Sequence, residues 1–205
     1  MLDAICDVLR ISHQLQWISS RDGNASFRPK NEKCIYVTPS GVRKQHLNKN
    51  MILKLQLTND RESLYTYENK GLQPTGELKL HLLLQKSKQD RVVLHLHPTF
   101  IISAMYAGID LQEISRIFPE INRYTRVGPT VPEVPPISEK LAEETVKAFG
   151  LDKEGNVKYD IIGLKQHGVV IIANDIWTAF EHCERLEHIC HIVLASGKYK
   201  HISRL

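Results

Sequence analysis

One short stretch, VVLHLH at residues 92–97, constrains the fold more than any other part of the chain. A charged pair precedes it and Pro98 follows it, and its length and apolar character predict a buried strand. Because side chains alternate between the two faces of a strand, His95 and His97 are predicted to share one face. Two neutral imidazoles at this spacing can bind one cation, since histidine is the commonest metal ligand. The alternative is that both histidines simply pack without a metal. Other residues in the chain must decide between a metal site and simple packing.

A third histidine lies in the segment KQHGVV at residues 165–170. His167 is predicted to lie at a turn between strands, and Gly168 after it lets another backbone or a ligand approach closely. Together, His95, His97 and His167 would supply the three-histidine shell of an open catalytic zinc site. The remaining coordination position of such a site is free for water or substrate.

The last long helix carries five other potential ligands: His182, Cys183, Glu187, His188 and His191. Two pairs of these, Glu187 with His191 and His188 with His191, lie at helical spacing and could chelate a metal. We interpret this group as a polar face of the helix, because mixed polar clusters on a helix usually line a solvated or inter-helix surface. The sequence therefore favours the strand histidines as the metal site.

Glu77 follows a glycine-containing turn and is predicted to lie in the first turn of a helix that begins near Thr75. A carboxylate there interacts favourably with the helix dipole, which is one explanation for a glutamate at position 77. The other is a general acid/base beside the metal. His81 lies one helical turn further on the same face, where it either orients a neighbour or simply packs.

Three turns rich in small residues complete the candidate site: GNAS at 23–26, TPSG at 38–41, and Thr75-Gly76. Each exposes backbone N–H groups and hydroxyl or amide side chains, from which phosphate-binding nests are built. The sequence alone does not show whether the three turns converge.

The composition excludes several classes of protein. The 205 residues carry a net charge of +4 in a mixed pattern, without the basic blocks of a nucleic-acid-binding surface. Four cysteines without CxxC spacing favour a reducing compartment. The sequence has neither a secretory signal pattern nor an apolar run long enough to cross a membrane, so we expect a soluble, cytoplasmic protein.

Short strands joined by short loops predict a mainly antiparallel sheet, and the helical segments between them are expected to cover it. We therefore expect one α/β domain over residues 1–205. The expected strands are 25–28, 34–38, 51–57, 64–67, 92–97, 160–164 and 168–173; the expected helices are 2–18, 75–86, 99–106, 111–117, 138–149 and one from Asn174 or Asp175 to 196, with 127–136 extended.

The ordered set of motifs resembles the class II aldolase/adducin family: GNAS at 23–26, VTPSGV at 37–42, PTGE at 74–77, HLH at 95–97 and QHG at 166–168. The match spans about residues 9–195, and five motifs in the right order are specific although each is weak alone. The family often has two serines before the glutamate, where this chain has Thr75-Gly76.

The resemblance implies a homotetramer with active sites at subunit interfaces and one Zn²⁺ per subunit. It implies that His95, His97 and His167 ligate zinc, while Glu77 serves as acid/base and as a ligand of the empty site. The phosphate-binding positions implied by the resemblance are Asn24, Ser40, Gly41, Thr75 and Gly76.

The expected activity is that of a zinc-dependent aldehyde-lyase. It would cleave a phosphorylated ketose of the fuculose-1-phosphate type by retro-aldol chemistry through a metal-stabilised enediolate. A sugar-phosphate epimerase or a methylthioribulose-1-phosphate dehydratase on the same metal site is the nearest alternative. A non-catalytic, adducin-like interaction protein is a further one. A cupin-like barrel is excluded, because no glutamate follows closely after His97.

Overall fold

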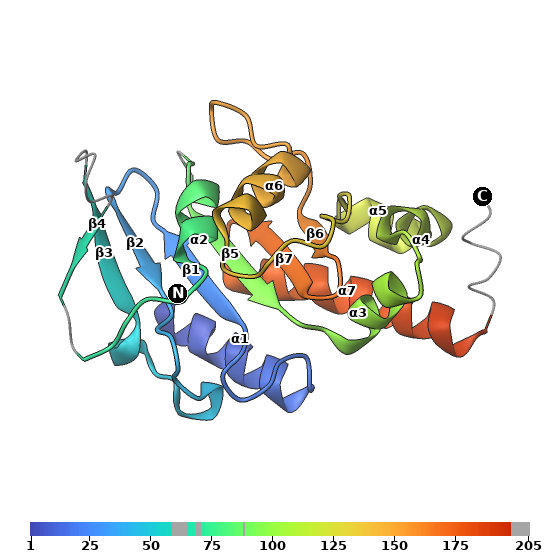
Figure 1. The fold of residues 1–205 in the computed structure, drawn as a ribbon, viewed down its shortest axis with the longest axis horizontal. Helices are drawn as coiled ribbons and strands as arrows, with labels where there is room; N and C mark the ends of the chain where they lie inside the picture. Colours follow the sequence, from blue (N-terminus) through green and yellow to red (C-terminus); the bar gives the residue numbers. More distant parts are fainter. Residues whose placement is uncertain (59–64, 69–70, 88, 198–205) are drawn as a thin grey trace.

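The strands of the described chain form one seven-stranded sheet, in the order β4-β3-β2-β1-β5-β7-β6 (Figure 1). The computed structural model describes residues 1–58, 65–68, 71–87 and 89–197. Every neighbouring pair of strands is antiparallel, as the sequence predicted. The strands are β1 (Asn24–Arg28), β2 (Cys34–Val37), β3 (Leu53–Leu57), β4 (Tyr65–Tyr67), β5 (Arg91–Leu96), β6 (Ile161–Leu164) and β7 (Gly168–Ala173).

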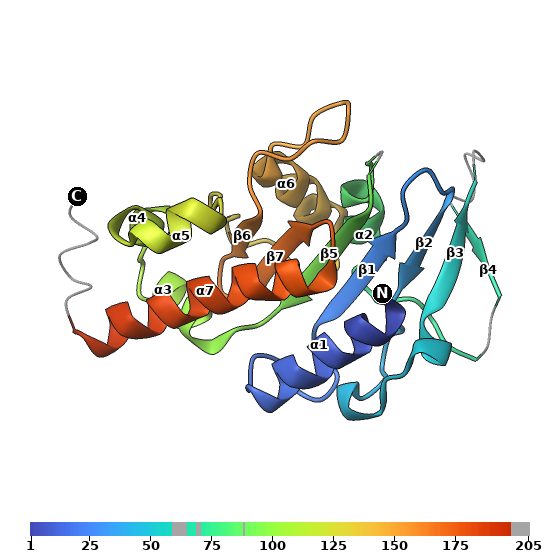
Figure 2. The same cartoon turned by 180° about the vertical axis from the view of Figure 1, so that it is seen from behind.

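Helices lie on both faces of this sheet. They are α1 (Leu2–Gln14), α2 (Leu78–Leu84), α3 (Thr99–Tyr106), α4 (Leu111–Ile117), α5 (Pro119–Tyr124), α6 (Glu139–Phe149) and α7 (Ile176–Ala195), with short 3₁₀ turns η1 (Lys44–His46) and η2 (Lys49–Met51). Seen from behind, α1 and α7 cover one face, whereas α2 and α6 contact each other on the opposite face (Figure 2). The helix-covered sheet predicted from the sequence is confirmed.

Strand β5 lies at the centre, between β1 and β7, and all of its residues are buried. Its side chains divide between two hydrophobic cores, because alternate residues face opposite sides of a sheet. Val92 and Leu94 belong to the core under α1 and α7, and Val93 belongs to the core under α2 and α6. The predicted alternation is therefore confirmed, and His95 lies on the same face as Val93.

The first helix ends earlier than predicted. We expected it to reach Ile18, but α1 ends at Gln14 and Gln16 adopts a left-handed conformation with φ 61°. This reversal turns Trp17 back into the core, where its ring stacks on Phe180 with the ring centroids 5.2 Å apart. Burial of a tryptophan outweighs the few tenths of a kcal/mol that one more helical residue contributes.

The helix after the PTG turn is also shorter than predicted. Thr75 is not its cap, because α2 begins at Leu78 and Glu77 occupies the N-cap position without a side-chain cap bond. The turn before it is instead joined to another turn, through an isolated bridge between Pro39 and Pro74. This long-range contact, which local propensity does not encode, fixes where α2 starts.

The remaining expectations differ in detail. The segment 127–136 is extended as predicted, and it pairs parallel to β6 through the bridges Val127–Ile161 and Val131–Leu164. Helix α5 and the two 3₁₀ turns were not predicted, and Met51 lies in η2 rather than in a strand. The polar loop expected at 58–63 and the residue Leu64 lie outside the described residues, apart from Thr58.

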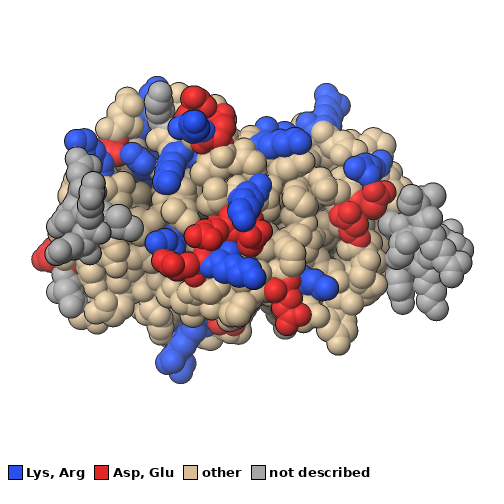
Figure 3. Space-filling model, turned by 45° about the horizontal axis from the view of Figure 1, so that its top comes forward, with Lys and Arg blue, Asp and Glu red and all other residues tan. Residues whose placement is uncertain are grey.

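The surface agrees with the charge pattern of the sequence. On the face shown in Figure 3, acidic and basic side chains are interspersed, and no continuous basic tract crosses it. None of the described helices is long and apolar enough to cross a membrane.

Candidate metal centre and active site

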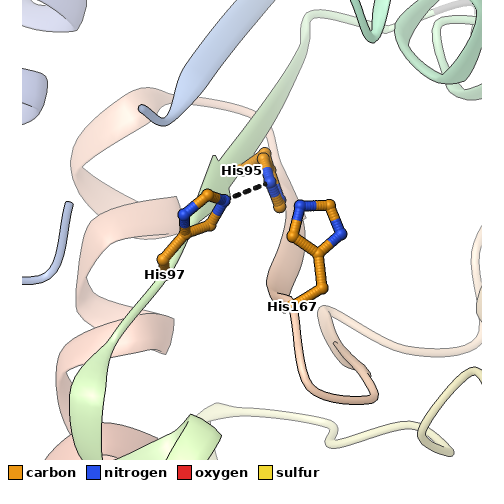
Figure 4. A group of neighbouring side chains, drawn as sticks. All are labelled: His95, His97 and His167. Carbon is orange, nitrogen blue, oxygen red and sulfur yellow. Dashed lines mark hydrogen bonds between the residues drawn. The ribbon is translucent and has the colours of Figure 1, made fainter. Parts of the chain in front are cut away.

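The three histidines predicted as metal ligands lie together at one end of the central strands. Their imidazoles point toward one another (Figure 4), and one ring nitrogen from each lies within 4.8 Å of the others. The Nε2 atoms of His95 and His97 are 2.8 Å apart. Within the residues that the structure describes, no other group of three His, Cys, Asp or Glu side chains is close enough to hold an ion.

The backbone brings these rings together because β5 pairs with β7. His95 and His97 come from the end of β5, and His167 comes from the turn between β6 and β7. Gly168 permits this approach. A Cβ atom there would lie 2.3 Å from the carbonyl oxygen of Leu96 and 2.8 Å from Cδ2 of His97, too close for any other residue. The close approach predicted at Gly168 is confirmed.

The ring nitrogens are prepared to act as lone-pair donors. The Nδ1–H of His95 donates to the carbonyl oxygen of Val169 at 2.9 Å, which leaves the lone pair on Nε2, the atom nearest His97. Burial, followed by the neighbouring imidazoles, lowers the pKa of His97 to about 3. Burial and then His95 also lower the pKa of His167. His97 and His167 are therefore neutral at pH 7, the form that binds a metal.

Glu77 lies beside two of the three imidazoles, those of His95 and His167. Its side chain is buried, and its Oε2 accepts a hydrogen bond of 2.8 Å from Nδ2 of Asn24 and lies 3.4 Å from Nε2 of His95. Its Oε1 is buried without a hydrogen-bond partner, 3.8 Å from Nε2 of His167. Burial raises the pKa of this carboxyl, but the electrostatic interaction with the neighbouring His95 imidazole and the Asn24 bond together hold it below its usual value.

This donor set fits a divalent metal ion. A buried polar atom without a partner is costly, and Oε1 of Glu77 is such an atom beside neutral imidazoles. A cation would satisfy Oε1 and the converging ring lone pairs together. Three imidazoles and one carboxylate match the ligands that zinc and similar transition metals prefer.

The three small-residue turns converge on this group. They line a cavity of about 260 Å³ together with His95, His97, His167 and Glu77. Each residue expected at the phosphate-binding positions lies in its wall: Asn24, Ser40, Gly41, Thr75 and Gly76. The convergence that the sequence left open is therefore present in the fold.

Only some of the backbone N–H groups at the expected phosphate-binding positions are free of hydrogen bonds within the protein. The N–H of Ser40 donates to the carbonyl oxygen of Gln73 at 2.8 Å, and the N–H of Thr75 donates to that of Thr38 at 3.1 Å. These bonds hold the two turns side by side. Among the described residues, no hydrogen bond uses the backbone N–H of Gly41 or Gly76. Gly41 and Gly76 line the cavity together with Ser40 and Thr75, so two free backbone N–H groups and two hydroxyls are candidates to bind an anion there.

Sequence reasoning missed Lys44, which lines the same cavity and is only 2% exposed. Its Nζ donates to the carbonyl oxygens of Arg21 at 2.9 Å and Val42 at 3.3 Å, and burial lowers its pKa to about 8. Lysine is almost never buried, so no sequence pattern points to this position. Arg21, Asp22 and Ile137 also line the cavity without having been predicted.

Several residues of the polar cluster on α7 contact neighbouring helices, in line with the solvated or inter-helix face inferred from the sequence. The buried His182 pairs with the hydroxyl of Thr125 at 2.8 Å, and the ring of His191 stacks on Phe100. The carboxylate of Glu187 accepts the backbone N–H groups of Phe100 at 2.9 Å and Ile101 at 2.8 Å, in the first turn of α3. These contacts account for most of the polar cluster as helix packing.

Comparison with known proteins extends this picture to the whole chain. The family model described as the class II aldolase and adducin N-terminal domain matches residues 3–194. The chain belongs to this family. The resemblance inferred from five motifs is thereby confirmed, and membership of this class II aldolase family places the chain among the metal-dependent lyases.

Curated relatives within the family catalyse different reactions. An L-fuculose phosphate aldolase of Methanocaldococcus jannaschii is 28% identical over 91% of this chain and 92% of its own length. A 3-oxo-tetronate 4-phosphate decarboxylase of Pectobacterium atrosepticum is 25% identical over 81% of this chain and 71% of its own. A methylthioribulose-1-phosphate dehydratase of Sclerotinia sclerotiorum is 22% identical over 90% and 79%.

A solved structure agrees with the fold of this class II aldolase family member. The sugar-phosphate aldolase from Thermotoga maritima superimposes with a TM-score of 0.74 over 96% of both chains, at 22% identity. At this identity the likeness shows the fold alone.

Proposed function

We propose that this protein is a zinc-dependent aldolase that cleaves a phosphorylated ketose of the fuculose-1-phosphate type into a ketose-phosphate fragment and an aldehyde. One observation supports this proposal most strongly. It is the Oε1 atom of Glu77, which is buried without a hydrogen-bond partner 3.8 Å from Nε2 of His167, in a cavity that the three histidines and the small-residue turns line together. The similarity over nine tenths of the chain to an L-fuculose phosphate aldolase also favours it.

In this proposal, His95, His97 and His167 would hold the ion, with Glu77 as a further ligand of the substrate-free site. When bound, zinc would supply a Lewis acid for the carbonyl and hydroxyl oxygens of the ketose. The Nδ1–H bond of His95 to Val169 keeps that ring in the ligating orientation.

The phosphate of the substrate would bind at the opposite end of the cavity. Its oxygens would accept from the backbone N–H groups of Gly41 and Gly76, from the hydroxyls of Ser40 and Thr75, and from the amide of Asn24. The buried Lys44, which lines the same cavity, would add an ammonium group to these donors. Fixing the phosphate orients the ketose relative to Glu77.

Glu77 would move the proton. In the substrate-free site Oε1 would serve as a ligand; with the ketose bound, Oε1 would instead accept its hydroxyl proton as the adjacent C–C bond breaks and the hydroxyl carbon becomes the aldehyde. The electron pair of that bond stays on the phosphate-bearing fragment, and Oε1 returns the proton to its carbon. A lowered pKa keeps Glu77 ionised, as this base role requires.

The direct test supplies purified, metal-stripped protein with Zn²⁺ and phosphorylated ketoses and identifies the products. Zinc-dependent release of an aldehyde is expected. Glu77→Gln should lower kcat by roughly 10²–10⁴-fold, because it removes general acid/base catalysis but keeps the shape of the side chain. Absence of cleavage with every ketose tested, in the presence of bound zinc, would exclude the aldolase.

The relatives define the alternative outcomes. Exclusive loss of water from methylthioribulose-1-phosphate would indicate a dehydratase, and loss of CO₂ from a 3-oxo-tetronate 4-phosphate would indicate a decarboxylase. Interconversion of ketose epimers without cleavage would indicate an epimerase. An adducin-like interaction protein would instead tolerate His95→Ala without any loss of metal content or activity.

The proposal includes the assembly and the location implied by the family. We propose a homotetramer located in the cytoplasm and one domain over residues 1–205. Sedimentation of the purified protein tests the assembly, with a particle of about four subunit masses as the expected result.

A further inference from the structure

A chain of buried hydrogen bonds leads from Glu77 into the core. Asn24 donates from Nδ2 to Glu77 at 2.8 Å, and its Oδ1 lies 2.6 Å from Nε2 of His81. Nδ1 of the same ring lies 2.7 Å from Oγ of Ser26. Ser26 in turn accepts from Nε2 of Gln85 at 2.8 Å. The chain joins β1 to α2 directly behind the cavity wall.

The groups at the two ends of this chain, the carboxylate of Glu77 and the amide of Gln85, determine which atom donates in each hydrogen bond between them. Nδ2 of Asn24 donates to Oε2 of Glu77, so the amide oxygen of Asn24 faces His81 and can only accept from it. His81 must therefore donate from Nε2 and accept at Nδ1 from the hydroxyl of Ser26. The lone pair that remains on Ser26 accepts from Gln85, as observed.

Three members of the chain are almost completely inaccessible to solvent. His81 and Ser26 are 0% exposed and Gln85 is 1% exposed. Burial lowers the pKa of His81 to about 4, so its ring is neutral at pH 7 as the bond directions require. Both ring nitrogens of His81 and the hydroxyl of Ser26 are paired in this chain, whereas Oε1 of Gln85 is buried without a hydrogen-bond partner. Burying such polar side chains is unfavourable, and leucine would serve better at position 81 if packing were its only role.

We infer that His81 is a positioning residue that holds the amide of Asn24 with its oxygen toward the core and its NH₂ toward the cavity. The first consequence is that one N–H fixes Oε2 of Glu77, which leaves Oε1 for the ion. The second is that the cavity receives only donor atoms from Asn24, a polarity that suits an anion. The identification of that anion as a substrate phosphate rests on the proposed function.

Two substitutions of His81 separate this role from simple packing. The amide nitrogen of glutamine can occupy the place of Nε2 and still donate to Asn24, whereas asparagine reaches only the place of Nδ1 beside Ser26. We expect His81→Asn to weaken the affinity for Zn²⁺ about 10-fold or more, because losing the group that orients a ligand typically costs 10–100-fold. His81→Gln should stay within about 3-fold of the wild type.

The same variants are tested with inorganic phosphate on the zinc-loaded protein. His81→Asn should weaken phosphate binding about 10-fold, the equivalent of one hydrogen bond of about 1.4 kcal/mol. The matched control is His182, another buried histidine whose Nδ1 pairs with a hydroxyl, that of Thr125. His182→Asn and His182→Gln should leave both affinities within about 2-fold.

The tautomer of His81 gives a readout that needs no variant. Imidazole ¹⁵N–¹H correlation spectra of the metal-free protein should show His81 protonated at Nε2 only. Protonation at Nδ1 would overturn the inference, and so would equal affinities in wild type and His81→Asn, or an equal loss in His81→Gln. Because these readouts use zinc and phosphate alone, a protein that passes them but cleaves no ketose would contradict the proposed function and leave the inference standing.

Discussion

Ile137 occupies a backbone conformation that branched side chains avoid. Its φ is 62°, in the left-handed region, and its side chain is 66% exposed in the wall of the cavity. A Cβ atom at Gly76 would lie 3.2 Å from its Cδ1, so Ile137 lies directly over the small-residue turn. Strain of this kind often occurs beside functional sites, where the surrounding structure imposes it.

Relieving this strain should stabilise the protein. The left-handed conformation costs an L-residue about 1–2 kcal/mol, and asparagine tolerates it better than isoleucine. We therefore expect Ile137→Asn to raise the free energy of unfolding by about 0.5–1 kcal/mol in urea titrations. Ile137→Val, which keeps the branched side chain, should give no gain. A loss of stability in Ile137→Asn would mean that apolar contacts at this position outweigh the strain.

His81 should make the metal-free protein sensitive to acid. Its pKa is about 4 in the folded state and about 6.5 unfolded, so between these values the unfolded chain binds a proton that the folded protein does not. The free energy of unfolding should therefore fall as the pH is lowered from 7 to 4, by about 3 kcal/mol from this residue. Urea titrations at several pH values should show a smaller fall in His81→Gln, and identical slopes would contradict the assignment.

The sequence pointed to a functional residue where its motif is rare. It did not point to residues whose role depends on their burial in the fold. An HxH pattern on a strand and a glutamate after a PTG turn are uncommon combinations, so His95, His97 and Glu77 stood out. Lys44 did not, because a lysine reads as a surface residue until the fold encloses it. The role of His81 also stayed open, since its partners Asn24 and Ser26 lie more than 50 positions away in the chain.

Among the elements, α7 begins at a well-defined cap. The side chain of Asp175 accepts from the backbone N–H groups of Trp177 and Thr178, each at 3.0 Å. Removing such a cap costs about 1 kcal/mol. We expect Asp175→Ala to lower the free energy of unfolding by about that amount, while Asp175→Asn retains the cap and stays near the wild type. Equal stability of all three proteins in urea titrations would show that tertiary packing alone starts this helix.

Element types were predictable more reliably than element ends. The caps Ser138 and Asp175 and the pattern of β5 each act within one turn or one strand, so α6, α7 and β5 appear where expected. The ends of α1 and α2 are instead set by the core position of Trp17 and by the bridge between Pro39 and Pro74. Contacts between distant segments override local propensity at such places.

At the scale of the whole molecule, a bound ion should link parts of the sheet that are distant in sequence. A ligand present at 100 times its Kd stabilises the folded state by about 2.7 kcal/mol, which for a chain of this size corresponds to roughly 5–10 °C in Tm. We expect Zn²⁺ to raise the Tm of metal-stripped protein by this amount, measured by calorimetry. His97→Ala should show a much smaller shift, and an unchanged wild-type Tm would argue against a metal site.

The sequence by itself determined which residue types could carry the chemistry, because the period of a strand and the spacing of its histidines are local properties. It also indicated the antiparallel sheet and, through the order of five motifs, the family. Only the tertiary structure decided that the turns around Asn24, Ser40 and Thr75 meet beside β5, that Lys44 is enclosed, and that His81 supports Asn24. The physical reason is that strand register, set by the pairing of whole faces, determines which distant side chains become neighbours.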